Sequence, residues 1–197
     1  MRDLGGHPTE DGRRTCFGAV VRADSVRQLS EAGWAALVAH GVRTVVDLRH
    51  DEELAADPPR ELPVDVMHVP LMPAPASPEW PQIDEVADAA PDAVTATRDV
   101  YLEILRRRPA QFAAAVRAVA GAPKGGVVVH CLAGKDRTGL LAALLLRLVR
   151  VPRDDVAADY ALSEANLATI LQPWVAKAAD ELEAVHERLL GEPVLTP

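Results

Sequence analysis

Hydrophobic positions along the chain form short β-branched runs and longer stretches with helical spacing, and the two kinds of segment alternate. The β-branched runs predict strands over residues 17–22, 43–48, 64–71 and 127–129. Apolar residues three and four apart predict helices over residues 30–41, 93–107, 109–121 and 140–149, and Ser30 is expected to cap the first of them. Alternating strands and helices are typical of an α/β fold. Both faces of the strand at 64–71 have mixed character, which indicates an edge position.

A proline-rich segment at about 70–91 interrupts this pattern. Its prolines exclude a long regular helix and leave at most a short one around residues 83–88. We expect the segment to be either a lid over a pocket or a static loop anchored by Trp80. Residues at about 152–190 are predicted to be helical, with an amphipathic stripe and a kink at Pro173. The length of 197 residues predicts a single domain over 1–197.

Composition and charge narrow the possible functions. The formal net charge of −8 leaves the chain as a whole without a basic face, which argues against nucleic acid as a partner. The longest apolar run, residues 139–146, is too short for an integral membrane segment. No apolar signal-peptide core follows Met1, so we expect a cytoplasmic protein, with secretion without a signal peptide left open. The sequence indicates no oligomeric state.

The most informative stretch is residues 127–139, which read Val-Val-Val-His-Cys-Leu-Ala-Gly-Lys-Asp-Arg-Thr-Gly. The pattern predicts a buried strand, a tight loop and the start of a helix. A helix N-terminus presents unpaired N–H groups and the positive end of the helix dipole, so it favours an oxyanion. Cys131 and Arg137 flank this loop, and the arginine fork can pair two oxygens of one tetrahedral anion. In this setting the cysteine is expected to be a thiolate nucleophile.

Other interpretations of the same stretch fit less well. A nucleotide-binding P-loop is excluded because Val129 stands where its first glycine belongs and Asp136 follows the lysine. The second cysteine, Cys16, has no Cys-x-x-Cys partner, so no metal site is predicted. A buried cysteine is often only a small apolar residue. Here it coincides with a lysine and an arginine in one strand–loop–helix context, which favours a functional loop that needs neither metal nor cofactor.

These residues carry a family resemblance. His130, Cys131, Gly134, Arg137 and Thr138 match the signature loop of the protein tyrosine phosphatase superfamily, and the whole string from 130 to 139 resembles its bacterial tyrosine and phosphoinositide phosphatase branch. Residues 2–6 and 47–53 resemble further motifs of the same branch. The resemblance implies a protein-tyrosine-phosphatase-like α/β fold, with a central mixed, mostly parallel sheet flanked by helices.

The resemblance also implies a cysteine-dependent phosphomonoesterase with a phosphocysteine intermediate. Cys131 would attack phosphorus and Arg137 would clamp the phosphate. Thr138 would hydrogen-bond the cysteine sulfur and help it to leave, and His130 would order the loop. The backbone N–H groups from residue 132 to residue 137 would cradle the phosphate, which makes phosphate-binding residues of Leu132, Ala133, Gly134, Lys135 and Arg137.

The general acid has several candidates. Asp136 is preferred because the bacterial branch also has an aspartate at this place in the loop. Superfamily members commonly place an aspartate about thirty residues before the cysteine. In this chain that spacing points to Asp99, although a helix is predicted there. Other candidates, in the proline-rich segment and just after it, are Asp84, Asp88 and Asp92. Asp47 and Arg49 follow the strand at 43–48 and would support the site, unless they pair with each other or cap the next helix. For Asp47 and Arg49, pairing with each other or capping the next helix is the favoured interpretation.

The substrate class is open between phosphotyrosine proteins and phosphoinositides. Aromatic residues make up only 4% of the chain, which leaves few rings to enclose a phosphotyrosine. Lys135 is a compact charge that would reach a second phosphate, and this favours a broad specificity that includes lipids. Two rival functions are a pseudophosphatase that binds phosphorylated ligands without turnover and a thiol-based arsenate reductase or sulfurtransferase. The second rival is weaker because nothing in the sequence supplies a resolving cysteine.

Overall fold

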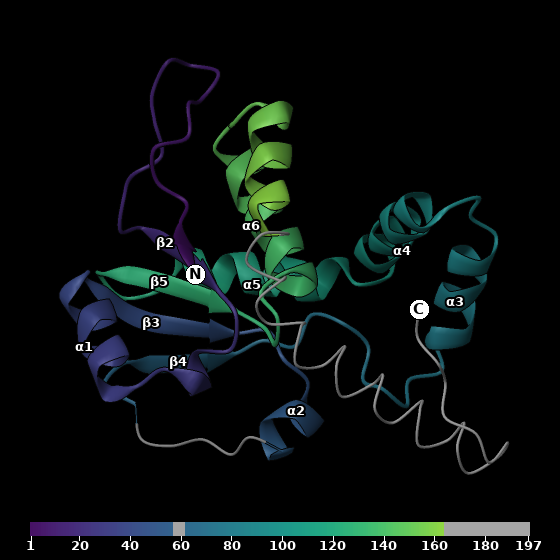
Figure 1. Ribbon diagram of the computed structural model, residues 1–197, viewed down its shortest axis with the longest axis horizontal. Coiled ribbons are helices and arrows are strands. Elements are labelled where there is room, and N and C mark those ends of the chain that lie inside the picture. Colours follow the sequence, from purple (N-terminus) through teal and green to yellow (C-terminus); the bar gives the residue numbers. More distant parts are fainter. Residues whose placement is uncertain (57–61, 164–197) are drawn as a thin grey trace, which may run out of the picture. The chain divides into compact units, whose positions relative to one another are not determined.

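The computed structural model describes residues 1–56 and 62–163 (Figure 1). Residues 1–160 form one compact unit, and a second unit begins at Ala161. The site and the pocket discussed below both belong to the first unit. The amphipathic stripe and the kink at Pro173 lie outside the described residues, so the single domain over 1–197 stays a prediction.

The first unit is built on a five-stranded sheet in the order β1-β2-β5-β3-β4. The strands are β1 (Arg2–Asp3), β2 (Val20–Ala23), β3 (Val42–Asp47), β4 (Asp65–His68) and β5 (Gly126–His130). Strands β2, β5, β3 and β4 are parallel to their neighbours, and β1 is antiparallel to β2. The sheet is therefore mixed and mostly parallel, as the resemblance implied, and β4 lies at the predicted edge.

Strand β5 is central and buried along its whole length. Val127 and Val129 pack into one core and Val128 into another on the opposite face. A strand covered on both faces has no solvent side and therefore reads as a continuous apolar run rather than as an alternation. This is why the sequence signal for β5 is clear and why the strand end at His130 is held firmly in place.

Helices cover both faces of the sheet (Figure 1). They are η1 (Val26–Gln28), α1 (Glu31–Ala39), α2 (Asp51–Ala56), α3 (Trp80–Asp88), α4 (Ala93–Arg107), α5 (Pro109–Ala120) and α6 (Asp136–Leu148), and residues 153–163 are also helical. Helix α1 packs on the face of Val128, and α5 and α6 pack on the face of Val127 and Val129. Ser30 caps α1 as predicted, because its Oγ accepts a hydrogen bond from the Gly33 N–H at 3.2 Å.

The N-terminal residues form a short strand that the hydrophobic pattern did not predict. Arg2 and Asp3 pair with Arg22 and Val21 as the short strand β1. The Asp3 carboxylate accepts hydrogen bonds from the backbone N–H groups of Gly5 at 2.8 Å and Gly18 at 2.7 Å, which fixes the turn beside the strand. Two residues are too few to show the alternation of apolar and polar positions that predicts a strand. The strand β1 is therefore recognised only by its pairing with β2.

The helix in the proline-rich segment begins earlier than predicted, at Trp80 rather than near residue 83. Pro81 stands in its first turn, where a missing N–H costs no intrahelical hydrogen bond. The Trp80 indole N–H donates to the carbonyl of Ala74 at 2.8 Å, and Ile83 is buried in the core. These contacts are those of an anchored segment, and its movement as a lid stays a prediction.

Candidate active site

The loop between β5 and α6 lies at the carboxyl ends of the parallel strands, where ligands bind in open α/β sheets. Two backbone hydrogen bonds tie it to its neighbours: the Leu48 N–H donates to the carbonyl of His130 and the Ser25 N–H to that of Leu132, both at 2.9 Å. Gly134 has φ +68, and a Cβ there would stand 2.6 Å from the Ala23 carbonyl oxygen. Glycine is therefore required at this position by both conformation and space.

Cys131 follows directly on β5 and is buried, with 2% of its surface exposed. The preceding His130 is also buried, and its Nδ1 lies 3.0 Å from the Cys131 carbonyl oxygen. Its Nε2 faces the Asp47 carboxylate at 3.4 Å. His130 thus points away from the loop interior and holds the backbone on which Cys131 sits, which is the geometry of a residue that orders the loop.

Arg137 lies in the first turn of α6, and its guanidinium is paired with Glu53 of α2. Its Nη2 donates to Glu53 Oε1 at 2.8 Å, and its Nη1 donates to Oε2. Burial alone would lower the pKa of Arg137, but the bond to Glu53 and the charge of the Cys131 sulfur outweigh it and raise that pKa. A guanidinium has five N–H donors, so Glu53 leaves three for the Cys131 sulfur and an anion. Glu53 was not predicted to be a site residue, although the acidic run after residue 49 was a signal for a partner of the arginine.

A buried ion network supports the loop from behind. The Arg22 Nη2 donates to the carbonyl of Gly134 at 3.0 Å, and its Nη1 donates to Asp159 Oδ2 at 2.7 Å. Arg2 Nε donates to the other oxygen of Asp159 at 2.7 Å. Burial would raise the pKa of Asp159, but hydrogen bonding to Arg2 and the charge of Arg22 lower it instead. The N-terminal motif is thus connected to the loop, through two residues, Arg22 and Asp159, that the sequence analysis did not single out.

Asp136 is held by two neighbours in the structure. Lys135 Nζ donates to its Oδ1 at 2.6 Å, and the Tyr101 hydroxyl of α4 donates to the same oxygen. The Tyr101 hydroxyl also lies 3.0 Å from that of Tyr160. Burial would lower the pKa of Lys135, but the hydrogen bond and charge of Asp136 outweigh it and raise that pKa. Neither tyrosine was predicted at the site, because helical spacing explained Tyr101 as a core residue.

Asp47 and Arg49 pair with each other, which is the interpretation the sequence favoured. Arg49 Nη2 donates to Asp47 Oδ2 at 2.8 Å and Nε to Oδ1 at 3.0 Å, and both side chains are buried. Burial would raise the pKa of Asp47, but hydrogen bonds from His130 and Arg49 hold it far below its usual value. The pair therefore supports the loop through His130.

The remaining predicted site residues differ in whether their side chains already have hydrogen-bond or ion-pair partners. Thr138 is fully buried, and its hydroxyl makes no hydrogen bond with any residue of the described chain, so the expected bond to the Cys131 sulfur stays a prediction. Asp92 caps α4 through the Thr95 N–H at 2.7 Å, and Asp99 pairs with Arg98 at 2.8 Å. These two alternative acids are engaged elsewhere. Asp84 and Asp88 are exposed on α3.

Two broader properties hold for the part of the chain that the structure describes. In residues 1–56 and 62–163, no three His, Cys, Asp or Glu side chains are grouped closely enough to hold a metal ion. None of the helices in these ranges is both long enough and apolar enough to cross a membrane.

The fold and the loop together define a class of protein: an α/β protein that presents a buried cysteine and an arginine around one helix N-terminus, at the carboxyl ends of parallel strands. The sequence model described as the tyrosine phosphatase family matches residues 1–194. The chain belongs to this family, and the resemblance that the loop motif carried is confirmed.

Curated relatives agree with this assignment. The chain is 33% identical over 148 residues to the tyrosine-protein phosphatase of Nostoc commune, covering 74% of this chain and 48% of the relative. It is 32% identical over 173 residues to the triple specificity protein phosphatase PtpB of Mycobacterium tuberculosis, covering 73% and 60%. The chain thus spans about half to two thirds of the length of these relatives. Among solved structures, P. aeruginosa TpbA in complex with pTyr matches with a TM-score of 0.38 at 22% identity, over 75% of this chain and 69% of that one.

Proposed function

We propose that this chain hydrolyses phosphoric monoesters through a phosphocysteine intermediate. The observation that carries the proposal is the loop at residues 131–137, in which a buried cysteine and a guanidinium with donors that Glu53 does not take flank one helix N-terminus. Membership of the tyrosine phosphatase family supports the same chemistry. Thiolate attack is favoured because the helix dipole and Arg137 both stabilise negative charge on the Cys131 sulfur.

The reaction we propose has two displacements. Cys131 Sγ attacks phosphorus in line, the bond to the leaving oxygen breaks, and a general acid gives that oxygen a proton. Water then attacks phosphorus and gives a proton to the carboxylate that acted as the acid, the S–P bond breaks, and inorganic phosphate leaves with the thiolate and the acid both restored. In both steps Arg137 and the backbone N–H groups of the loop stabilise the equatorial oxygens, which is the main demand of phosphoryl transfer.

We propose Asp136 as the general acid. In the structure its carboxylate accepts hydrogen bonds from Lys135 and Tyr101, which hold it beside the phosphate loop. An anionic substrate competes with Asp136 for the Lys135 ammonium. Once Lys135 turns towards the substrate, the Asp136 carboxyl group is released from that contact and can meet the leaving oxygen. Substrate binding would then prepare the acid for the leaving group.

For the substrates, we propose phosphotyrosine proteins together with phosphoinositides. Lys135 supports the inclusion of lipids, because its single charge lies beside the phosphate loop and suits a second phosphate. A relative whose name includes triple specificity is consistent with a broad range. A working thiolate requires a reducing compartment, and we propose the cytoplasm.

The rival is a protein of the same family that binds phosphorylated ligands without turnover. Pre-steady-state hydrolysis of p-nitrophenyl phosphate separates the two functions. We expect a burst of nitrophenol equivalent to the enzyme concentration or, if hydrolysis of the intermediate is fast, linear turnover that vanadate inhibits. Vanadate binding without any release of nitrophenol would contradict the proposal and support the rival. A panel of phosphopeptides and phosphoinositides then defines the substrate class.

A further inference from the structure

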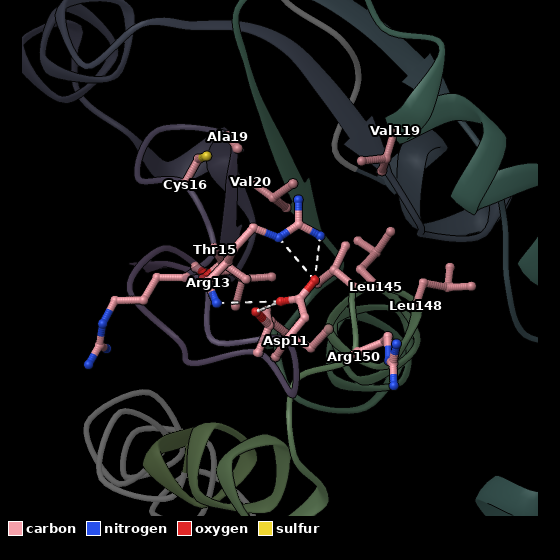
Figure 2. Close-up of a pocket in the computed structure, with 15 residues that line it drawn as sticks. Asp11, Arg13, Thr15, Cys16, Ala19, Val20, Val119, Leu145, Leu148 and Arg150 are labelled. Carbon is pink, nitrogen blue, oxygen red and sulfur yellow. Dashed lines mark hydrogen bonds and ion pairs between the residues drawn. The ribbon is translucent and has the colours of Figure 1, made fainter.

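A pocket lies away from the catalytic loop, where the N-terminal loop passes over the end of α6 (Figure 2). Its volume is about 660 Å³, within the range of about 300 to 1,000 Å³ common for small-molecule sites. Helix α6 starts at Asp136 in the catalytic loop and ends at Leu148 in this pocket. At a rise of about 1.5 Å per residue the two sites are about 18 Å apart along the helix.

The floor of the pocket is apolar. The last turn of α6 contributes Leu145 and Leu148, and its C-cap contributes Val149. Leu4 and Val20 continue the apolar surface. Figure 2 shows Leu145 and Leu148 on one side of the pocket and the N-terminal loop on the other. Leu148 is 64% exposed and Val149 52% exposed, which is unusual for adjacent large apolar residues. The floor is therefore a continuous strip that suits a linear hydrocarbon.

The rim of the pocket is positive. Three arginines and one aspartate line it: Arg13, Arg14, Arg150 and Asp11. Just outside, Glu10 pairs with Arg150 at 3.3 Å and with Arg147 at 3.2 Å. Four arginines against two acids leave a formal charge of +2, in a chain whose total is −8. Arg13 is itself paired with Asp11 at 2.6 Å. The excess positive charge, opposite in sign to that of the whole chain, favours an anion over a cation at this rim.

Arg150 adds a conformational observation. It follows the C-cap of α6 with φ 63, the left-handed position that glycine usually takes. A side chain there strains the backbone, and glycine would relieve the strain. Its backbone carbonyl accepts a hydrogen bond from the Glu10 N–H at 2.9 Å, which fixes the N-terminal loop above the pocket.

From these observations we infer that the pocket binds an anionic single-chain amphiphile, a fatty-acid-like carboxylate whose tail lies on the α6 strip and whose head meets the arginine rim. This site is separate from the catalytic loop, and the inference does not depend on the proposed activity. A membrane surface fits less well as the occupant, because docking through this pocket would place the catalytic loop at the far end of α6, away from the lipid.

The test is calorimetric titration of the full chain with dodecanoate below its micelle concentration. We expect saturable one-to-one binding that saturating vanadate leaves unchanged and that is at least about tenfold tighter than binding of dodecyltrimethylammonium, which has the same chain and a cationic head. Leu148→Asp introduces a charge into the strip, and Leu102→Asp is its control at an exposed leucine of α4. We expect only the first to weaken binding, by at least about fivefold.

Arg150→Gly separates binding from folding. It removes a rim charge and also relieves the strained backbone, so we expect an unchanged or higher Tm together with weaker dodecanoate binding. Four results would overturn the inference: no saturable binding, equal affinity for the cationic amphiphile, displacement by vanadate, or binding only to anionic vesicles. An undiminished affinity in both Leu148→Asp and Arg150→Gly would overturn it as well.

Discussion

At the scale of single residues, Lys135 and Asp136 neutralise each other in the unliganded loop, with Nζ and Oδ1 2.6 Å apart. An exposed ion pair of this kind is weak, because both groups are partly solvated. A phosphate of the substrate can therefore replace the Asp136 carboxylate as the partner of Lys135 at little cost. In the proposed mechanism Lys135 contacts a second phosphate and Asp136 protonates the leaving oxygen, so each role can be tested by the choice of substrate.

The first prediction concerns Lys135→Ala. We expect hydrolysis of polyphosphorylated inositol lipids to fall by about tenfold or more, because a point charge matters most where a second phosphate is present. Hydrolysis of a phosphotyrosine peptide should fall by less. The measurement is kcat/KM for both substrates, with Lys124→Ala, at an exposed turn before β5, as control. Equal losses on both substrates would remove the reason for proposing lipids.

The second prediction concerns Asp136→Asn. A positioned acid contributes about 10²- to 10⁴-fold, but only where the leaving oxygen needs a proton. With p-nitrophenyl phosphate the loss should be small, and with an alkyl phosphate it should approach that range. Because an acid must be protonated to act, its deprotonation limits the rate at high pH, and the variant should lose that limb of the pH profile on the alkyl substrate.

Asp99→Asn is the matched control for this comparison, since Asp99 is the alternative acid by spacing and pairs only with Arg98 among the bonds described above. We expect it to behave as the unmodified protein on both substrates. If Asp136→Asn slows both substrates by one common factor, Asp136 shapes the loop and the acid lies elsewhere.

At the scale of elements, three segments distant in sequence meet behind the loop. Strand β1 contributes Arg2, strand β2 contributes Arg22, and the helix at residues 153–163 contributes Asp159. Arg22 and Asp159 are 2% and 3% exposed, and the Gly134 carbonyl takes a further donor of Arg22. Removing one member of such a network leaves a buried charge without its partner, which is costly.

The third prediction is that Asp159→Asn lowers the free energy of unfolding by about 3 to 5 kcal/mol at pH 7. The pKa of Asp159 in the folded chain is below its ordinary value of 3.8. Its contribution to stability is therefore complete above about pH 4 and is lost as the pH falls through the folded-state pKa. Urea unfolding at pH 7 and in acid should show a difference between variant and parent that shrinks with falling pH. A difference independent of pH would contradict this account.

At the scale of the whole molecule, the sequence predicted what local patterns encode. The Val127–Val129 run, the leucines of α6 and the Ser30 cap each depend on neighbours in sequence, and the structure has them where periodicity placed them. The loop was recognisable for the same reason, since its residues are contiguous. The start of α3 at Trp80 was not predicted, because the many prolines argued against a helix there. Pro81 lies in the first turn of α3, where proline is tolerated.

What the sequence did not reveal depends on pairing between distant segments. Arg22 meets Asp159 across 137 positions, Arg137 meets Glu53 across 84, and Tyr101 meets Asp136 across 35. None of these contacts has a local period, so each needs the folded sheet to bring its partners together. The family was therefore predictable from one contiguous loop, whereas the residues that hold the loop in place were not.

The central claim is that Cys131 forms a covalent bond to phosphorus, and Cys131→Ser tests it most directly. Serine keeps the size of the side chain and leaves Arg137 and the backbone cradle in place, but its hydroxyl is a far weaker nucleophile at neutral pH. We expect turnover of p-nitrophenyl phosphate to fall by at least about 10³-fold, while calorimetric titration shows phosphate or vanadate still bound. Cys16→Ser, at the exposed second cysteine, should retain full turnover. Residual activity of Cys131→Ser above a few per cent of the parent, about 2 kcal/mol of barrier, would contradict the covalent route.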